Sequence, residues 1–263
     1  MKDFSFKSKK PVCFFDSGIG GLNLLGECIK RIPNKQFVYF ADNFNVPYGN
    51  YSEEKILILA NKIFSEIQQY NPIAAVIACN TVTAVCIEYL RNKYSFPIIG
   101  IQPAIKPAAK NCRRCVVLAT PATAHSTGIC RLVERFGRGV TDVVACDKLA
   151  AYIENNVFDL NKEKIYDFLP DIKAESIVLG CTHYTYIKQI VKEKYGCSVF
   201  DGMCGTAERL CSVLNNIEEC ETDNIENESK LLKKTELYLP EVIFKGGDEW
   251  KNERVFKEVV MSK

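Results

Sequence analysis

The sequence predicts an α/β protein of two pseudo-symmetric domains, each with a mostly parallel sheet flanked by helices. Strand-like and helix-like segments alternate along the chain with short connections, which is typical of parallel sheets covered by helices. Two pairs of short motifs recur at nearly the same offset, which indicates an internal repeat. The 263 residues, 47% of them apolar and 25% charged, suffice for one large α/β domain or two small ones.

The first part of the chain alternates four strands with three helices. Short apolar runs bounded by turn formers predict the strands, at residues 11–16, 36–42, 72–78 and 96–101. Apolar residues at helical spacing predict the helices, within residues 17–32, 52–70 and 79–94. Ser52 is a suitable N-cap, because acidic residues fill the turn that follows it. Residues 43–51 are rich in turn formers and predict a loop.

The same pattern then restarts. Strands are expected within residues 115–120, 139–147, 176–180 and 197–201. Helices are expected within residues 105–112, 124–137, 148–155, 161–170, 183–196 and 205–216, with Gly137 ending the second of them. The polar segment 219–234 has no periodicity and predicts an exposed loop.

A last strand at 235–239 and a last helix at 250–260 are expected to return to the first domain. That domain would then be discontinuous. The predicted division gives residues 1–102 and 211–263 to the first domain and residues 103–210 to the second.

The repeat places two cysteines at equivalent positions. "FFDSG" at the end of the first strand matches "VLATP", so Asp16 and Thr120 stand 104 residues apart. "VIACNT" matches "VLGCTH", so Cys79 and Cys181 stand 102 residues apart. A shared offset indicates two similar halves, each with a cysteine at the end of a strand.

Composition excludes several classes of protein. The net charge of +2 predicts no surface for nucleic acid. No apolar run approaches the roughly 20 residues of a membrane helix, and the start of the chain does not resemble a signal peptide. A cytoplasmic location is therefore expected for the protein. Its thirteen cysteines are then expected to be reduced thiols. Cys112 and Cys115 form a CxxC, but it precedes a strand and has no second CxxC beside it, so a structural role is expected.

In open parallel sheets, ligands bind where the strands end. We therefore expect the active site in the cleft between the two domains. Helix N-termini behind these strand ends favour a bound carboxylate and lower the pKa of a neighbouring cysteine. The candidate residues at such ends are Asp16, Ser17, Cys79, Asn80, Thr81, Thr120, Cys181, Thr182 and His183.

Two thiols on opposite sides of one small ligand suit the inversion of a stereocentre. One thiolate removes a proton from a carbon, and the opposite thiol returns a proton to the other face. Thr and Asn side chains and helix-start N–H groups stabilise the negative charge that develops on the carbon. Asp16, near Cys79, and His183, near Cys181, are candidates to relay protons or to tune each thiol.

Five ordered motifs between about residues 11 and 210 make the chain resemble bacterial glutamate racemases, of the aspartate/glutamate racemase superfamily. They are "FFDSGIGG", "VPYGN", "ACNTVTA", "GCTHY" and "DGMCGTAERL". The resemblance implies conversion of L-glutamate to D-glutamate for peptidoglycan, with no cofactor and no metal. It also implies a homodimer with a small-molecule substrate, and no nucleic-acid or membrane partner.

The resemblance assigns roles to particular residues. It implies that Cys79 and Cys181 are the catalytic thiols, with Asp16 and His183 as auxiliary proton carriers and Glu154 as a further helper. The residues expected to contact the amino acid are Asp16, Ser17, Pro47, Tyr48, Gly49, Asn80, Thr81, Thr120, Thr123, Thr182 and His183.

The chain departs from the family pattern at positions that flank these residues. Gln102 stands where the family usually has Glu, and Thr185 and Tyr186 stand where it usually has Pro-Leu. Pro121 stands where a charged or small residue is more usual. These departures bear on regulation, domain packing and rate more than on the type of reaction.

Other functions remain open. Another racemase of the superfamily, acting on aspartate or a different amino acid, would share the two thiols. A non-catalytic amino-acid-binding protein would have no need of them. A hydrolase with Cys181 as nucleophile and His183 as base is disfavoured, because residues two apart at a helix start rarely align and Cys79 stays unexplained. "DSGIGG" lacks the GK[ST] ending of a nucleotide-binding P-loop.

Overall fold

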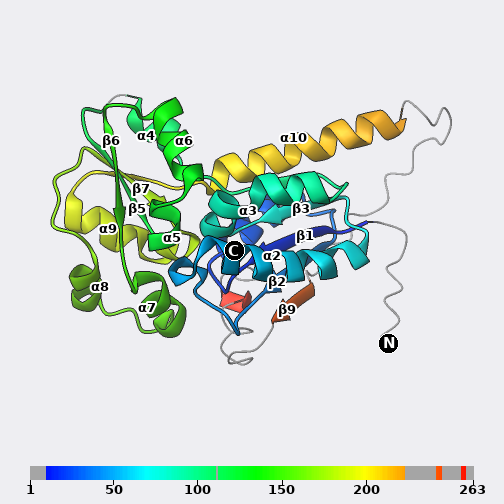
Figure 1. Cartoon of the computed structure of the whole chain (residues 1–263), viewed down its shortest axis with the longest axis horizontal. Helices are drawn as coiled ribbons and strands as arrows, with labels where there is room; N and C mark the ends of the chain where they lie inside the picture. The colour runs from blue at the N-terminus through cyan, green and yellow to red at the C-terminus, as the bar shows by residue number, and fades with distance from the viewer. Residues whose placement is uncertain (1–9, 111, 223–240, 245–255, 259–263) are drawn as a thin grey trace.

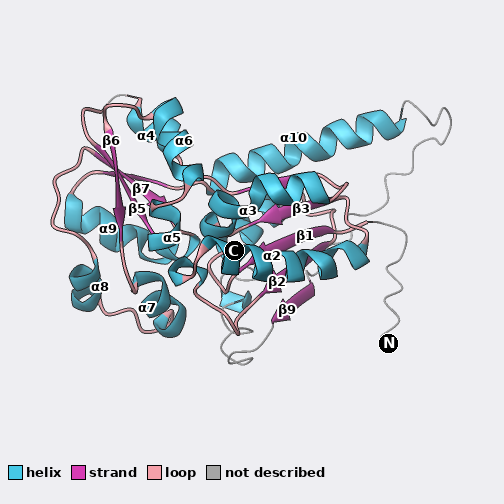
Figure 2. Cartoon of the chain, in the orientation of Figure 1, coloured by secondary structure: helices cyan, strands magenta, loops and turns pink. Residues whose placement is uncertain are grey.

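The chain folds into two α/β halves that lie side by side (Figures 1 and 2). The computed structural model describes residues 10–110, 112–222, 241–244 and 256–258. Every strand pairing in both sheets is parallel, and helices flank each sheet. The predicted fold class is therefore confirmed.

The first half is built on a five-stranded sheet in the order β4-β3-β1-β2-β9. Its strands are β1 (Val12–Asp16), β2 (Phe37–Ala41), β3 (Ala74–Ile77), β4 (Ile98–Gly100) and β9 (Glu241–Phe244). The helices of this half are α1 (Leu22–Arg31), the 3-10 helices η1 (Tyr48–Asn50) and η2 (Gln68–Tyr70), α2 (Glu53–Ile67), α3 (Asn80–Lys93) and the long α10 (Met203–Thr222).

Helices cover both faces of this sheet, which explains its nearly continuous apolar strands. Val12 and Phe14 pack into the core beneath α1 and α10, whereas Cys13 and Phe15 pack into the core beneath α2 and α3. Ser52 caps α2 as predicted, since its hydroxyl accepts a hydrogen bond from the backbone N–H of Lys55.

The second half is built on a four-stranded sheet in the order β6-β5-β7-β8. Its strands are β5 (Cys115–Ala119), β6 (Thr141–Ala145), β7 (Ser176–Gly180) and β8 (Ser198–Phe200). Its helices are α4 (Ile105–Ala109), α5 (Pro121–Ala124), α6 (Thr127–Phe136), α7 (Leu149–Asn156), α8 (Lys162–Phe168), the 3-10 helix η3 (Thr182–Ile187) and α9 (Lys188–Tyr195).

The two sheets share one topology. β1 lies between β2 and β3, and β4 lies beyond β3; β5 lies between β6 and β7, and β8 lies beyond β7. The strands that precede Cys79 and Cys181, β3 and β7, therefore occupy equivalent places. The internal repeat predicted from the sequence motifs corresponds to this shared arrangement.

The C-terminal part of the described chain returns to the first half. β9 pairs with β2, and α10 packs against α1 and runs along this half (Figure 1). The predicted strand at 235–239 and most of the predicted helix at 250–260 lie outside the described residues. The division at residues 102 and 210 stays a prediction, and α10 continues through its second boundary.

Three predicted helices differ in the structure. The helix predicted at 205–216 begins at Met203 and continues to Thr222 as α10, so the first four residues of the loop expected at 219–234 are helical. The predicted helix at 124–137 begins only at α6, because Ser126 adopts extended backbone and caps it after the short α5. Gly137 follows its last residue, as expected. The predicted helix at 183–196 begins as the 3-10 helix η3, where the Thr185 hydroxyl donates to the Thr182 carbonyl at 2.7 Å and competes with α-helical bonding.

Twelve of the thirteen cysteines, from Cys13 to Cys211, are free thiols. Cys112 donates from its thiol to the Ala108 carbonyl at 3.1 Å and lies 3.3 Å from the Ser176 hydroxyl, contacts that fit the structural role expected for this CxxC. Over the same part of the chain, no helix combines the length and apolarity that crossing a membrane requires.

Candidate active site

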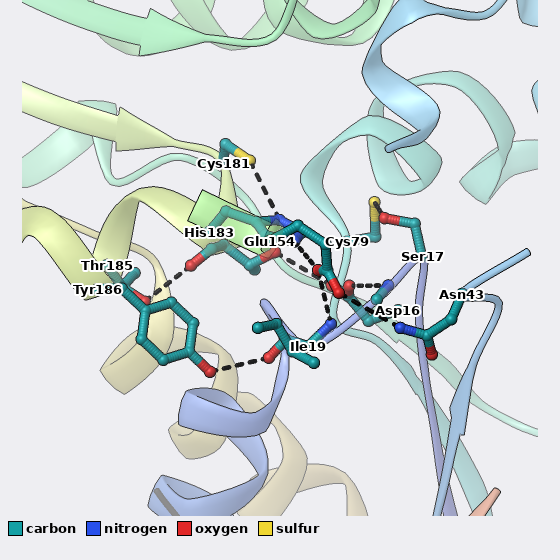
Figure 3. Close-up of polar contacts among 12 residues, drawn as sticks. Asp16, Ser17, Ile19, Asn43, Cys79, Glu154, Cys181, His183, Thr185 and Tyr186 are labelled. Carbon is teal, nitrogen blue, oxygen red and sulfur yellow. Dashed lines mark hydrogen bonds and ion pairs between the residues drawn. The ribbon is translucent and has the colours of Figure 1, made fainter. Parts of the chain in front are cut away.

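The predicted strand-end residues lie after β1, β3, β5 and β7, and Figure 3 shows those of β1, β3 and β7 close to one another. All of the strand-end residues are buried, and the two cysteines retain only 5% and 6% of their exposure. The structure is therefore closed around this point, and entry of a ligand requires the halves to separate.

Asp16 is the last residue of β1 and joins the two halves. Its Oδ1 accepts a hydrogen bond from the backbone N–H of Gly18 at 2.7 Å. Its Oδ2 accepts a hydrogen bond from the Thr182 hydroxyl of the second half at 3.1 Å. Burial is the main cause that raises the pKa of Asp16 from 3.8 to about 6, against the opposing charge of His183. Asp16 can therefore exchange a proton near neutral pH.

Cys79 occupies the N-cap of α3, immediately after β3. Its thiol lies 3.9 Å from the Ser17 hydroxyl, and the backbone N–H of Val82 also faces the sulfur. The expectation that the helix start lowers the pKa of this thiol is wrong for Cys79. Burial, followed by the charge of Asp16, raises the pKa above its usual value and outweighs the Val82 N–H.

Cys181 occupies the equivalent place after β7, at the N-cap of η3. Its Sγ lies 3.8 Å from Nδ1 of His183, and Nε2 of His183 lies 2.5 Å from Oε2 of Glu154. A chain of thiol, imidazole and carboxylate thus leads away from Cys181 (Figure 3). A thiol and an imidazole two residues apart at a helix start were expected to align only rarely, but Sγ of Cys181 and Nδ1 of His183 are in contact here.

His183 is completely enclosed, and burial alone would lower its pKa. Hydrogen bonds with Cys181 and Glu154, together with the negative charges of these groups, outweigh burial and raise the pKa well above its usual value. The imidazole therefore carries a proton that it can share with either neighbour.

Glu154, on α7, accepts hydrogen bonds from the first half. Besides His183, its carboxylate accepts from the backbone N–H of Ile19 at 3.1 Å and from the side-chain amide of Asn43 at 3.3 Å. Sequence reasoning did not find Ile19 or Asn43. Nothing in the loop sequence signals that Asn43 reaches a carboxylate 111 positions later.

Three threonines form a second link between the halves. The hydroxyl of Thr81, at the start of α3, lies 3.0 Å from that of Thr120 and 3.1 Å from that of Thr123, and these two lie 2.9 Å apart. Beside Thr81, the amide nitrogen of Asn80 is buried without a hydrogen-bond partner among the described residues. This group of polar side chains can bind a carboxylate once the halves open.

The segment Pro47–Gly49 lies against the second half. A Cβ atom at Gly49 would come within 2.5 Å of Cβ of Thr120, so only glycine permits this approach. The hydroxyl of Tyr48 donates to Asp42 at 2.6 Å, within its own half. Contact of Pro47, Tyr48 and Gly49 with an amino acid therefore stays a prediction, and their observed contacts shape the loop and the position of Thr120.

The two thiols lie within electrostatic range of each other. The charge of Cys181 is among the causes that raise the pKa of Cys79. Each sulfur has its own polar partner, a hydroxyl for Cys79 and an imidazole for Cys181. The site thus presents two buried thiols with different polar neighbours, one from each half.

Comparison with known proteins agrees with this arrangement. The chain is 38% identical to the glutamate racemase of Campylobacter curvus over 219 residues, which cover 77% of this chain and 82% of that protein. It is 39% identical to the glutamate racemase of Clostridium novyi over 214 residues, which cover 77% and 83%.

A solved structure of Escherichia coli glutamate racemase, in complex with L-glutamate and an activator, resembles this one with a TM-score of 0.71 and 28% identity. The match covers 79% of this chain and 83% of that chain. Residues 26–210 match the family model for Asp/Glu/hydantoin racemases. The chain therefore belongs to the Asp/Glu/hydantoin racemase family.

Proposed function

We propose that this protein is a cofactor-independent glutamate racemase that uses Cys79 and Cys181 as its two bases. The observation that carries the proposal is the placement of these cysteines. They follow equivalent strands of two similar halves, are buried at one boundary and have different proton partners. The family membership and the glutamate racemases among its relatives support the choice of reaction.

The proposed reaction moves one proton at a time. The thiolate of one cysteine takes the α-proton, so that a carbon–hydrogen bond breaks, a sulfur–hydrogen bond forms and the electron pair stays on the α-carbon. The thiol of the other cysteine then gives its proton to the opposite face of that carbon, which inverts the stereocentre and leaves a thiolate behind. Each positioned acid or base contributes about 10²–10⁴ in rate.

Different residues would prepare each thiol. His183 carries a proton between Cys181 and Glu154, which it contacts with its two ring nitrogens. Asp16, with a pKa near 6, is the buried carboxyl whose charge acts on Cys79. The two sides of the site are therefore chemically unequal even though the cysteines occupy equivalent positions.

The polar groups around the thiols would bind the amino acid. The Thr81, Thr120 and Thr123 hydroxyls and the unpartnered Asn80 amide donate hydrogen bonds to carboxylate oxygens. Donors fixed in a site closed to water also stabilise the negative charge of the transition state. Ser17 and Thr182, at the ends of β1 and β7, complete the expected contacts.

The wider role follows from the same proposal. D-Glutamate formed here would supply peptidoglycan synthesis in the cytoplasm, and the active protein would be a homodimer. Aspartate remains the nearest alternative substrate.

Purified protein, without added pyridoxal phosphate, is incubated with L-glutamate or L-aspartate, and both enantiomers are measured by chiral chromatography. We expect D-glutamate to form, and a fall of about 10²–10⁴ in kcat/KM in Cys79→Ser and in Cys181→Ser. Cys130→Ser is the matched control, since Cys130 is an exposed thiol on α6 and its replacement should leave activity near that of the wild type. D-Aspartate alone, or near-full activity in either serine variant, would overturn the proposal.

A further inference from the structure

The second turn of η3 contacts the first half beside the site. The hydroxyl of Tyr186 donates to the backbone carbonyl of Ile19 at 2.9 Å (Figure 3). The side-chain amide of Asn23 donates to the Thr185 hydroxyl at 2.9 Å.

Ile19 belongs to the turn that follows Asp16, and hydrogen bonds fix the backbone of this turn. The Ile19 N–H donates to Glu154, while its carbonyl accepts from Tyr186. The neighbouring Gly18 carbonyl accepts from Tyr39 at 2.9 Å. A Cβ atom at Gly20 would come within 2.7 Å of Nδ1 of His183, so the turn already touches the imidazole.

The geometry of η3 explains why Tyr186 reaches this turn. A 3-10 helix has three residues per turn, so residues three apart lie on the same side. His183 and Tyr186 therefore extend towards the first half from one short helix, and they end on Glu154 and on Ile19. Because Ile19 in turn donates to Glu154, the four residues form a closed ring of contacts.

Tyr186 also links the two cores. Its ring packs against the core beneath α1 and α10 and against the core of the second half that contains Cys181. Burial, followed by the charges of Glu154 and Asp16, raises the pKa of Tyr186 well above its usual value, so the phenol keeps the proton that it donates.

We infer that Tyr186, supported by Thr185 and Asn23, is a positioning residue that fixes His183 and Glu154 against the Ile19 turn and so sets the proton-transfer geometry of Cys181. We call these three residues the interdomain latch. The inference rests on the proposed racemase function. The latch acts on the Cys181 side, because its ring of contacts includes the partners of Cys181 and neither Cys79 nor Ser17.

The proposal has a directional consequence. Free enantiomers have equal energies, so loss of the latch must lower kcat/KM equally for L- and D-glutamate. The barrier for proton transfer at Cys181 rises, however, and that at Cys79 does not. Removal of the α-proton from the substrate then limits the rate more in the direction in which Cys181 removes it. In the other direction Cys79 removes the α-proton, and this step limits the rate less.

The test compares Tyr186→Phe, which removes one hydroxyl and keeps the ring, with the wild type. We expect kcat/KM to fall about three- to tenfold, the loss typical of one hydrogen bond. The primary isotope effect with α-deuterated glutamate should rise in one direction and fall in the other. Asn23→Ala should change the isotope effects in the same sense, through Thr185.

Tyr195→Phe is the control, because the Tyr195 hydroxyl donates to the Pro170 carbonyl and both residues belong to the second half, outside the latch. It should leave both isotope effects unchanged. Equal changes in both directions, or none, in Tyr186→Phe would overturn the latch while leaving the racemase proposal intact. Absence of racemisation in the wild type would instead overturn the proposed function.

Discussion

Replacing Asp16 by Asn should make the protein more stable at neutral pH while it loses activity. Asp16 is completely buried, and its pKa rises from 3.8 to about 6 in the folded protein. A carboxyl whose pKa is raised on folding stabilises the folded state below the unfolded pKa, and this contribution is lost as pH rises through the folded pKa. The Asp16 contribution is therefore full below about pH 4 and is gone above about pH 6.

The magnitude follows from the pKa values. A rise from 3.8 to about 6, at about 1.4 kcal/mol per pH unit, amounts to about 3 kcal/mol. Asn has no charge to bury, and its amide carbonyl still accepts from the Gly18 N–H. The free energy of unfolding of Asp16→Asn, relative to wild type, should therefore increase by about 3 kcal/mol between pH 4 and pH 7.5.

Urea unfolding, followed by circular dichroism from pH 4 to pH 8, measures this difference. Asp142→Asn is the matched control, because Asp142 is exposed on β6 and its replacement should change stability by at most about 0.5 kcal/mol at any of these pH values. A difference between Asp16→Asn and wild type that stays flat across this range would refute the reasoning that burial governs Asp16.

Three further substitutions and one control test the fold and the closed site. Ser52→Ala should lower the free energy of unfolding by about 1 kcal/mol in urea titrations, since it removes the N-cap of α2; an unchanged midpoint would contradict that cap. Leu25→Ala should lower it by about 2–5 kcal/mol because Leu25 is fully buried, whereas Ile58→Ala, at a side chain 59% exposed, should change it little. Gly20→Ala should abolish most racemase activity because its Cβ would lie 2.7 Å from the His183 ring, and full activity would show that the turn does not abut the imidazole.

The sequence predicted the strand ends well because their signals are local. Cys79 and Cys181 each follow a short apolar run and precede a helix, and β3 and β7 do occupy equivalent places in the two sheets. Ser52 as a cap and Gly137 as a helix end are likewise read from a few neighbouring residues.

Contacts between the halves could not be predicted from neighbouring residues in the sequence. Asn43 meets Glu154 and Tyr186 meets Ile19 only because two distant segments pack together, and neither residue type marks such a contact in advance. The prediction of a lowered pKa for Cys79 was wrong for the same reason. The helix start is a local feature, whereas the burial of Cys79 and the charge of Asp16 come from the assembled site.

The central claim is that Cys79 and Cys181 act on opposite faces of one α-carbon, and deuterium tracing tests it most directly. Wild-type protein is incubated briefly with L-glutamate in D₂O, and mass spectrometry measures deuterium in the separated enantiomers. We expect D-glutamate to carry deuterium at the α-carbon while the unreacted L-glutamate keeps its proton, because one thiol removes the proton and the other delivers deuterium. Deuterium in the recovered L-glutamate at the rate of product formation would show that a single base serves both faces, and would contradict the claim.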